Sequence, residues 1–104
     1  MRVYISGKIT GYEGYMERFQ KAEDWLTLQG YEPVNPARVN RQLPAGTTYA
    51  EYMRMALAML EMCDALFLLS NWRSSAGAQA EYYYAIALKK KIIYEKKDIY
   101  EEKT

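Results

Sequence analysis

The stretch SNWRSSAGAQAE, residues 70–81, combines hydroxyl side chains, glycine and one carboxylate between an apolar run and a helix-forming run. Ser75 and Gly77 fall where the amino end of the next helix is predicted, and unpaired N–H groups and the helix dipole favour an anion there. Glu81 follows in the second turn. A carboxylate in this setting suits glycosyl chemistry, because it can attack or stabilise an oxocarbenium-like anomeric carbon. The same residues also have a plain structural interpretation, a serine cap and a surface glutamate.

The composition narrows the chemistry. The chain has 104 residues, a formal net charge of +1 and no histidine, which excludes Ser-His and Cys-His nucleophile pairs and His-bearing zinc sites. We expect neither a metal nor a cofactor. The charge balance gives no electrostatic argument for binding a nucleic acid polymer or a membrane. The lone cysteine, Cys63, lies among apolar neighbours, which predicts a buried structural thiol in a reducing cytoplasm. With no apolar run of membrane-spanning length, we expect a cytoplasmic protein.

The first third of the chain predicts a strand, a helix and a second strand. Residues 2–6 (RVYIS) are β-branched and aromatic and precede a loop with glycines, which indicates a buried strand. Apolar side chains recur at helical spacing from about residue 12 to residue 29, and Gly30 supplies a helix stop. Residues 31–35 (YEPVN) predict a short strand, in which Pro33 favours an edge position.

A long loop and a capped helix are predicted next. Residues 35–48 contain two prolines and a glycine, and a long loop in so small a domain is often functional. Thr48 and Glu51 have the spacing of a capping box, which predicts a helix as far as about Met62.

The last third predicts strand, helix, strand and tail. Residues 64–69 (DALFLL) form a continuous apolar run, as expected of a central parallel strand covered on both faces. Ser74 or Ser75 then caps a helix that continues to about Lys89. The segment KKKIIYE supplies the final strand, and residues 96–104 form a charged tail.

This alternation predicts one three-layer α/β domain over residues 1–95, with a mainly parallel sheet of four to five strands. Right-handed crossovers make the doubly wound arrangement the economical one. Ligands bind such sheets at the carboxyl ends of the strands. The loops SGKITG and SNWRSSAGAQ both open on that edge, so we expect them to meet in one site.

Three segments carry a resemblance to a known family. They are YISGKITG at the start, GYEPVNPA after the first helix, and CDALFLLSNWRSSAGAQAEYYYAIAL in the second half. In these segments the chain resembles the nucleoside 2-deoxyribosyltransferase-like superfamily, especially small phage and bacterial members of the DUF4406 type, related to nucleoside 5′-monophosphate N-glycosidases. The resemblance implies a flavodoxin-like or Rossmann-like fold and cleavage of an N-glycosidic bond by a glutamate nucleophile. It places Glu81 at the nucleophile position.

Within this resemblance, Ser75 bears on the substrate. Relatives that act on free nucleosides tend to carry aspartate at this position, and relatives that hydrolyse 5′-monophosphates tend to carry serine. A carboxylate repels a phosphate, whereas a hydroxyl beside helix N–H groups can donate to it. Ser75 and Gly77 therefore favour a 5′-monophosphate, with Ser6, Gly7 and Lys8 as further contacts from the first loop. The alternative for these three residues is a glycine turn with a surface lysine.

One position departs from the family pattern. Members commonly carry an aspartate eight residues before the acid that opens the central strand, and it handles the leaving base. Here that acid is Asp64, and the residue eight positions earlier is Ala56. Alanine can neither protonate a base nor accept a hydrogen bond from it. Losing a general acid costs roughly 10²–10⁴ in rate, so turnover is expected to be slow or absent unless a symmetry mate or a shifted alignment supplies the acid.

Other residues carry weaker expectations. Asn35 follows the second strand, where base or sugar contacts are expected, but an Asn-Pro turn explains it equally well. Tyr4 and Trp72 either stack on a base or pack in the core. The tyrosine run 82–84 covers most sides of its helix, so at least one tyrosine is expected to face a subunit contact. The family implies a homo-oligomer, a dimer or larger.

Three functions follow from these features. The first is cleavage of a nucleoside or nucleoside 5′-monophosphate by hydrolysis or transfer, with Glu81 as nucleophile. The second is a catalytically impaired protein that binds or sequesters a nucleotide, which the alanine at position 56 favours. The third is an assembly module that uses the tyrosine-rich helix and the tail. Glu81→Ala and ligand-induced thermal stabilisation separate the first two.

Overall fold

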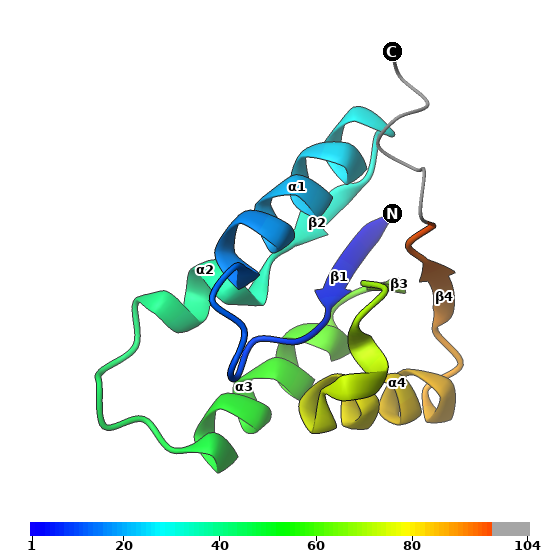
Figure 1. Ribbon diagram of the computed structural model, residues 1–104. Helices are drawn as coiled ribbons and strands as arrows, with labels where there is room; N and C mark the ends of the chain where they lie inside the picture. Colours follow the sequence, from blue (N-terminus) through cyan, green and yellow to red (C-terminus); the bar gives the residue numbers. More distant parts are fainter. Residues whose placement is uncertain (97–104) are drawn as a thin grey trace.

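Four parallel strands form one sheet in the order β2-β1-β3-β4 in the computed structural model, which describes residues 1–96 (Figure 1). The strands are β1 (Arg2–Ser6), β2 (Glu32–Val34), β3 (Ala65–Leu68) and β4 (Lys91–Tyr94). Strands that follow one another in the chain are connected through helices, as parallel strands require. The predicted α/β class with a mainly parallel sheet is confirmed. The predicted tail, apart from Lys96, lies outside the described residues.

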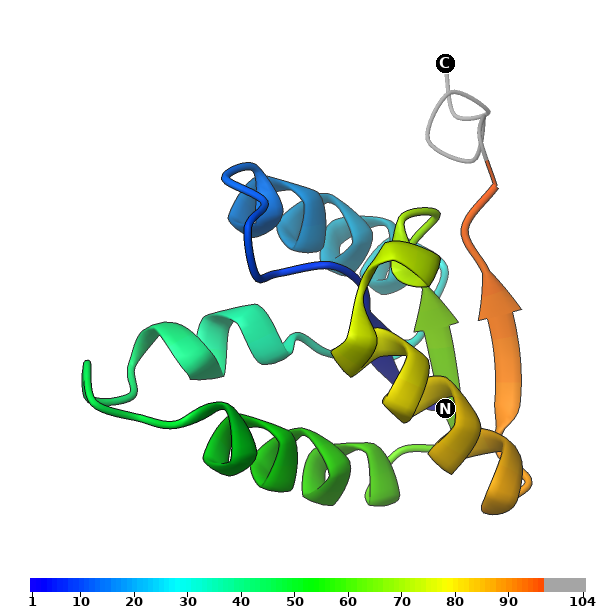
Figure 2. The same cartoon turned by 60° about the horizontal axis from the view of Figure 1, so that its bottom comes forward.

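Helices cover both faces of the sheet (Figure 2). α1 (Tyr15–Leu28) packs on one face, and α3 (Tyr49–Glu61) and α4 (Ala76–Ala87) lie on the other. The alternation of side chains along β1 divides the core accordingly. Val3 and Ile5 pack with the α1 side, whereas Tyr4 packs with the α3 and α4 side. One strand therefore contributes to two separate apolar clusters.

The two central strands are buried and fix the geometry of the sheet. β1 and β3 pair from Val3 opposite Ala65 to Ser6 opposite Leu68, and every residue of β3 is buried. Asp64, just before β3, accepts a hydrogen bond from the Arg2 backbone N–H at 2.9 Å, so it tethers the start of the strand. Pro33 lies in β2 at an edge of the sheet, as predicted for a residue that lacks an N–H group.

The helix ends follow the predicted chemistry. After α1, Gly30 has φ +89°, its N–H donates to Thr27, and the Tyr31 N–H donates to Leu26, which is the paired pattern that ends many helices at a glycine. Thr48 and Glu51 form the predicted capping box at the start of α3.

The predicted loop over residues 35–48 is partly wrong, because a short helix, α2 (Pro36–Arg41), occupies its first half. The side chain of Asn35 accepts a hydrogen bond from the Ala37 N–H at 3.0 Å and so caps this helix. Pro36 occupies the first helical position, where its fixed φ fits and its missing N–H costs nothing. The Asn cap and the proline can be recognised in the sequence as a helix start, but six residues are too few to show a helical period.

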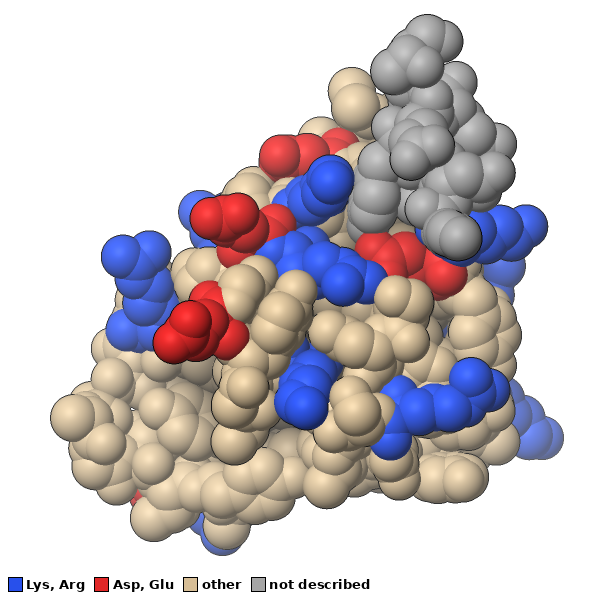
Figure 3. Space-filling model, in the orientation of Figure 1, with Lys and Arg blue, Asp and Glu red and all other residues tan. Residues whose placement is uncertain are grey.

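Charged side chains are unevenly distributed on one face of the molecule. Acidic and basic side chains lie side by side over the upper part of the face in Figure 3, and the lower left of that face is mostly uncharged. Cys63 is 1% exposed, and burial raises the pKa of its thiol to about 11, consistent with the predicted structural role. Among residues 1–96, no helix is long and apolar enough to cross a membrane.

Candidate active site

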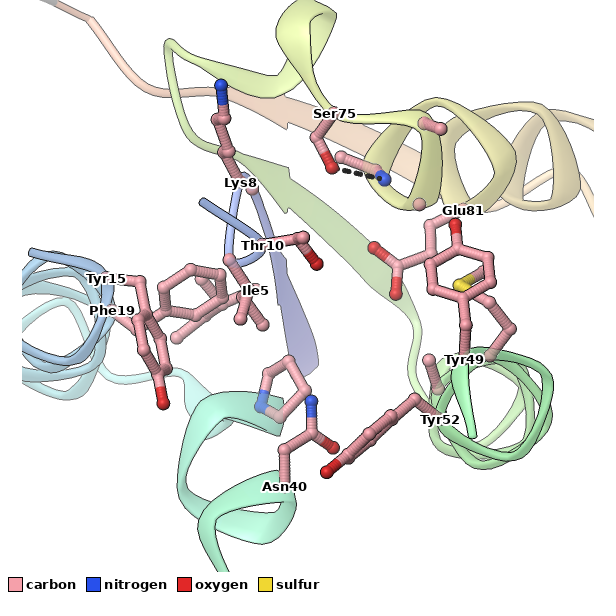
Figure 4. A pocket seen from close by; sticks show the side chains of 18 of the residues that line it. Ile5, Lys8, Thr10, Tyr15, Phe19, Asn40, Tyr49, Tyr52, Ser75 and Glu81 are labelled. Atoms are coloured by element: carbon pink, nitrogen blue, oxygen red, sulfur yellow. Dashed lines mark hydrogen bonds between the residues drawn. The ribbon is translucent and has the colours of Figure 1, made fainter. Parts of the chain in front are cut away.

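A cavity of about 660 Å³ opens at the carboxyl ends of the strands, between α1 and α2 on one side and α3 and α4 on the other (Figure 4). Both predicted loops line it. Residues 7–10 follow β1, and residues 74–78 span the connection from β3 into α4. The loops are tied together, since the Lys8 N–H donates to Asn71 Oδ1 at 3.1 Å and the Leu69 N–H donates to the Ser6 carbonyl at 2.8 Å. The two loops therefore meet at one edge of the sheet, as expected.

The carboxylate of Glu81 forms part of the cavity wall and has two hydroxyl donors. Tyr4 donates to Oε2 at 2.7 Å, and Ser6 donates to Oε1 at 2.5 Å. The two donors are alternate residues of β1, so they share the face of the strand that looks toward α4. The Glu81 residue is 7% exposed. Two partners on β1 thus fix the orientation of the Glu81 carboxylate, and the residue still borders the cavity.

Burial dominates the electrostatics of this carboxylate. Removal from water raises the pKa of Glu81 to about 7, although the hydrogen bonds from Ser6 and Tyr4 act in the opposite direction. The pKa of the Tyr4 hydroxyl is raised well above its ordinary value, first by burial and then by the Glu81 charge. The tyrosine therefore stays protonated and remains a hydrogen-bond donor. Near neutral pH, Glu81 passes between its acid and its carboxylate form.

The amino end of α4 forms one end of the cavity. Ser75 is the N-cap, and its hydroxyl accepts a hydrogen bond from the Ala78 N–H at 3.1 Å, so the predicted structural role of this serine is observed. Ser75 and Gly77 both line the cavity. A β-carbon at Gly77 would lie 3.3 Å from Met53 Sδ and 3.4 Å from the Tyr49 hydroxyl. Glycine thus keeps the wall open where the first turn of the helix faces the cavity.

Of the three residues predicted from the first loop, Gly7 and Lys8 line the cavity and Ser6 does not. Gly7 is buried and lines the cavity, and a β-carbon there would lie 2.6 Å from Leu69 Cδ1. Lys8 also lines the cavity, at the same end as Ser75 in Figure 4. Ser6 is 1% exposed and reaches the site only through its bond to Glu81. Glycine at position 7 therefore serves the close packing of the two loops.

Asn35 has a structural role outside the cavity. Besides capping α2, its Nδ2 group donates to Glu23 Oε1 at 3.0 Å, and the residue is not among those that line the cavity. Asn40, at the far end of α2, is in the lining instead and faces Tyr52 of α3 (Figure 4). Sequence reasoning did not single out Asn40 or Tyr52, because both become neighbours only through the unexpected helix.

The end of the cavity away from Lys8 is aromatic and uncharged. Tyr15 and Phe19 approach this end from α1, and Tyr52 approaches it from α3, whereas Tyr49 of α3 lies beside Glu81. Ala56 also lines the cavity and is 7% exposed. Its methyl group therefore borders the space that a larger polar side chain at this position would enter.

Apart from Tyr4, the other described aromatic residues lie outside the cavity lining. Trp72 is 9% exposed, and its ring centroid lies 4.7 Å from that of Tyr82. Tyr4 borders the cavity, but its ring packs in the core and its hydroxyl donates to Glu81. Tyr83 is 67% exposed.

The homo-oligomer and the cytoplasmic location stay predictions. Within residues 1–96, no cluster of three or more His, Cys, Asp or Glu side chains is placed to hold a metal.

Comparison with known proteins gives a family and a fold. The model of a domain of unknown function, DUF4406, matches residues 1–94. No curated protein matches the sequence. Among solved structures, a 2-deoxyribosyltransferase from Bacillus psychrosaccharolyticus superposes with a TM-score of 0.73 and 16% identity, over 90% of this chain and 71% of that one. A 2-deoxyribosyltransferase from Leishmania mexicana gives a TM-score of 0.67 and 17% identity, over 89% of this chain and 62% of that one.

Proposed function

The chain belongs to the DUF4406 family and has the fold of 2-deoxyribosyltransferases, and from this we propose that it cleaves the N-glycosidic bond of a nucleoside or nucleoside 5′-monophosphate. One observation carries the proposal: the buried carboxylate of Glu81 borders a nucleotide-sized cavity and is held by two hydroxyl donors. Carboxylates with this degree of orientation serve as nucleophiles in glycosyl transfer. We assign Glu81 that role.

In the first step, the Glu81 carboxylate attacks the anomeric carbon and the bond from that carbon to the base nitrogen breaks. The bonding electron pair leaves with the base. Tyr4 and Ser6 hold the carboxylate at the angle of attack, which lowers the entropic part of the barrier. Water or a second base then attacks the same carbon, releasing the carboxylate. Water makes the protein a hydrolase, and a second base makes it a transferase.

The 5′ end of the substrate is assigned to the amino end of α4. Ser75, Gly77 and Lys8 line this part of the cavity, where free N–H groups, the helix dipole and an ammonium group favour a phosphate. This assignment orients the sugar so that its anomeric carbon faces Glu81 and its base faces the aromatic end. We expect the 5′-monophosphate to bind more tightly than the parent nucleoside.

The test is base release from a panel of nucleoside 5′-monophosphates and their parent nucleosides, followed by chromatography. Glu81→Ala is expected to reduce release by at least ~10³, because the nucleophile is lost. Glu13→Ala is the matched control, since Glu13 is exposed and is not among the cavity-lining residues. Equal rates for Glu81→Ala and the unaltered protein would remove Glu81 from the mechanism.

A binding function is the second candidate, and the alanine at position 56 favours it. Within the described residues, the cavity lining contains no carboxylate besides Glu81, so a second carboxylic acid that could protonate the departing base is missing. Selective thermal stabilisation by one nucleotide without base release would support a binding protein. Absence of any stabilisation across the panel would contradict both functions.

A further inference from the structure

Among residues 1–96, a single acidic residue lines the cavity. Of the described side chains that border the cavity, Glu81 is the only carboxylate and Lys8 is the only cation. Glu81 is committed to the anomeric carbon if it is the nucleophile. The wall that faces the base then has tyrosines, a phenylalanine and an asparagine amide, but no carboxylic acid. This feature bears on which leaving groups the cavity can release.

Departure of an ordinary purine or pyrimidine leaves an anion on the ring, which a general acid must neutralise. Such assistance is typically worth 10²–10⁴ in rate. A base that is already cationic needs no acid, because the bonding electron pair neutralises its charge as it leaves. A site whose described lining has one nucleophile and no carboxylic acid for the base is therefore matched to a leaving group of this second kind.

The arrangement of charge in the cavity points the same way. Lys8 and Ser75 lie at one end, Glu81 lies between, and the rings of Tyr15, Phe19 and Tyr52 lie toward the other end (Figure 4). Aromatic faces attract a cation through the ring quadrupole. A substrate with a phosphate at one end and a cationic base at the other would place each charge against a favourable wall.

We infer that the preferred substrate is a nucleoside 5′-monophosphate whose base carries a positive charge, such as an N-ribosylpyridinium or an N7-alkylated purine nucleotide. This inference rests on the proposed function and specifies its substrate class. It also gives Ala56 a function, since a small apolar side chain leaves the base half of the cavity free of a second carboxylate.

The reaction balances without an added acid. The Glu81 oxygen forms a bond to the anomeric carbon as the bond to the ring nitrogen breaks, and its electron pair turns the cationic ring into a neutral base. Water then attacks the anomeric carbon, its proton passes to solvent, and the bond to Glu81 breaks with its electrons returning to the carboxylate. The products are the sugar phosphate and the neutral base.

The experiment compares two pairs of substrates that differ in charge but little in size. These pairs are nicotinamide mononucleotide against its reduced form, and 7-methylguanosine 5′-monophosphate against guanosine 5′-monophosphate. Base release is measured with the unaltered protein, and release with Glu81→Ala is subtracted to remove spontaneous hydrolysis. We expect kcat/KM to be 10²–10⁴ higher for the charged member of each pair. A ratio of tenfold or more supports the inference.

Variants at position 56 isolate the cause of the preference. Ala56→Asp is expected to raise kcat/KM for guanosine 5′-monophosphate by at least ~10-fold and to raise kcat/KM for the methylated nucleotide less, because the uncharged base is the one that needs an acid. Ala56→Asn has the same volume and no acid, and it controls for space and folding. Equal rates for the two variants on guanosine 5′-monophosphate would overturn the inference.

The outcomes separate this inference from the function on which it rests. Charged-to-uncharged ratios below tenfold, with clear base release, would overturn the inference and leave the glycosidic activity standing. No release from any of the four nucleotides by protein shown to be folded by circular dichroism would overturn both.

Discussion

Replacing Glu81 by glutamine is expected to abolish catalysis and to stabilise the fold at neutral pH. The side chain is 7% exposed and has a pKa of about 7, raised from 4.5 by burial. Between pH 4.5 and 7, the folded state therefore binds more protons at this group than the unfolded state does. The free energy of unfolding falls as pH rises through this window and levels off above it. Glutamine has no such dependence.

The magnitude follows from the two pKa values. Each tenfold difference in proton affinity corresponds to about 1.4 kcal/mol, so ionising Glu81 costs the folded state about 3 kcal/mol at pH 8. Glu81→Gln keeps the side-chain volume and removes this cost. We expect it to match the unaltered protein near pH 4.5 and to exceed its stability by up to about 3 kcal/mol at pH 8.

Urea unfolding at a series of pH values from 4.5 to 8.5 measures this difference directly. All other titrating groups are shared, so the pH dependence of the difference between the two proteins reports Glu81 alone. Glu13→Gln is the control, because Glu13 is exposed and its replacement is expected to change stability by less than ~0.5 kcal/mol. A difference that stays constant with pH would refute the reasoning that burial raises the pKa of Glu81.

Two further outcomes are expected. Ser6→Ala removes the hydrogen bond that lowers the pKa of Glu81, so the half-maximum of the pH–rate profile for base release should move to higher pH; an unchanged profile would contradict this. Gly7→Ala places a β-carbon 2.6 Å from Leu69 Cδ1, and we expect it to lower the free energy of unfolding, measured with urea, by about 1–3 kcal/mol. Gly46→Ala is the control, because no atom lies within 4 Å of its β-carbon, and it should leave the free energy of unfolding nearly unchanged.

Much of the fold could be predicted because its signals are local. A continuous apolar run marks the buried β3, glycine after a periodic segment marks the end of α1, and a Thr-to-Glu spacing marks the start of α3. Each signal depends on neighbouring residues and on rules that need no tertiary context. α2 escaped prediction because its six residues are held by a cap and a proline rather than by an apolar stripe.

The part of the site that could be predicted lies in the two loops that follow β1 and β3. The stretch 70–81 contains Ser75, Gly77 and Glu81 together, so their proximity needed no knowledge of the fold. Tyr4 was expected to stack or to pack, yet its hydroxyl holds Glu81 across a separation of 77 residues. The period-two alternation of β1 put Tyr4 and Ser6 on one face and was the available signal. Which element that face would meet depended on tertiary packing.

The hydrogen bonds from β1 to Glu81 also make the site depend on two segments that are far apart in the chain. The donors stand at residues 4 and 6 and the acceptor stands 77 and 75 positions further along. During synthesis the first strand leaves the ribosome long before α4 exists, so a nascent or truncated chain contains the hydroxyls without their carboxylate. Because these bonds form only when α4 packs against β1, chains that end before α4 lack the proposed nucleophile, and the glycosidic activity that we propose requires the packed fold.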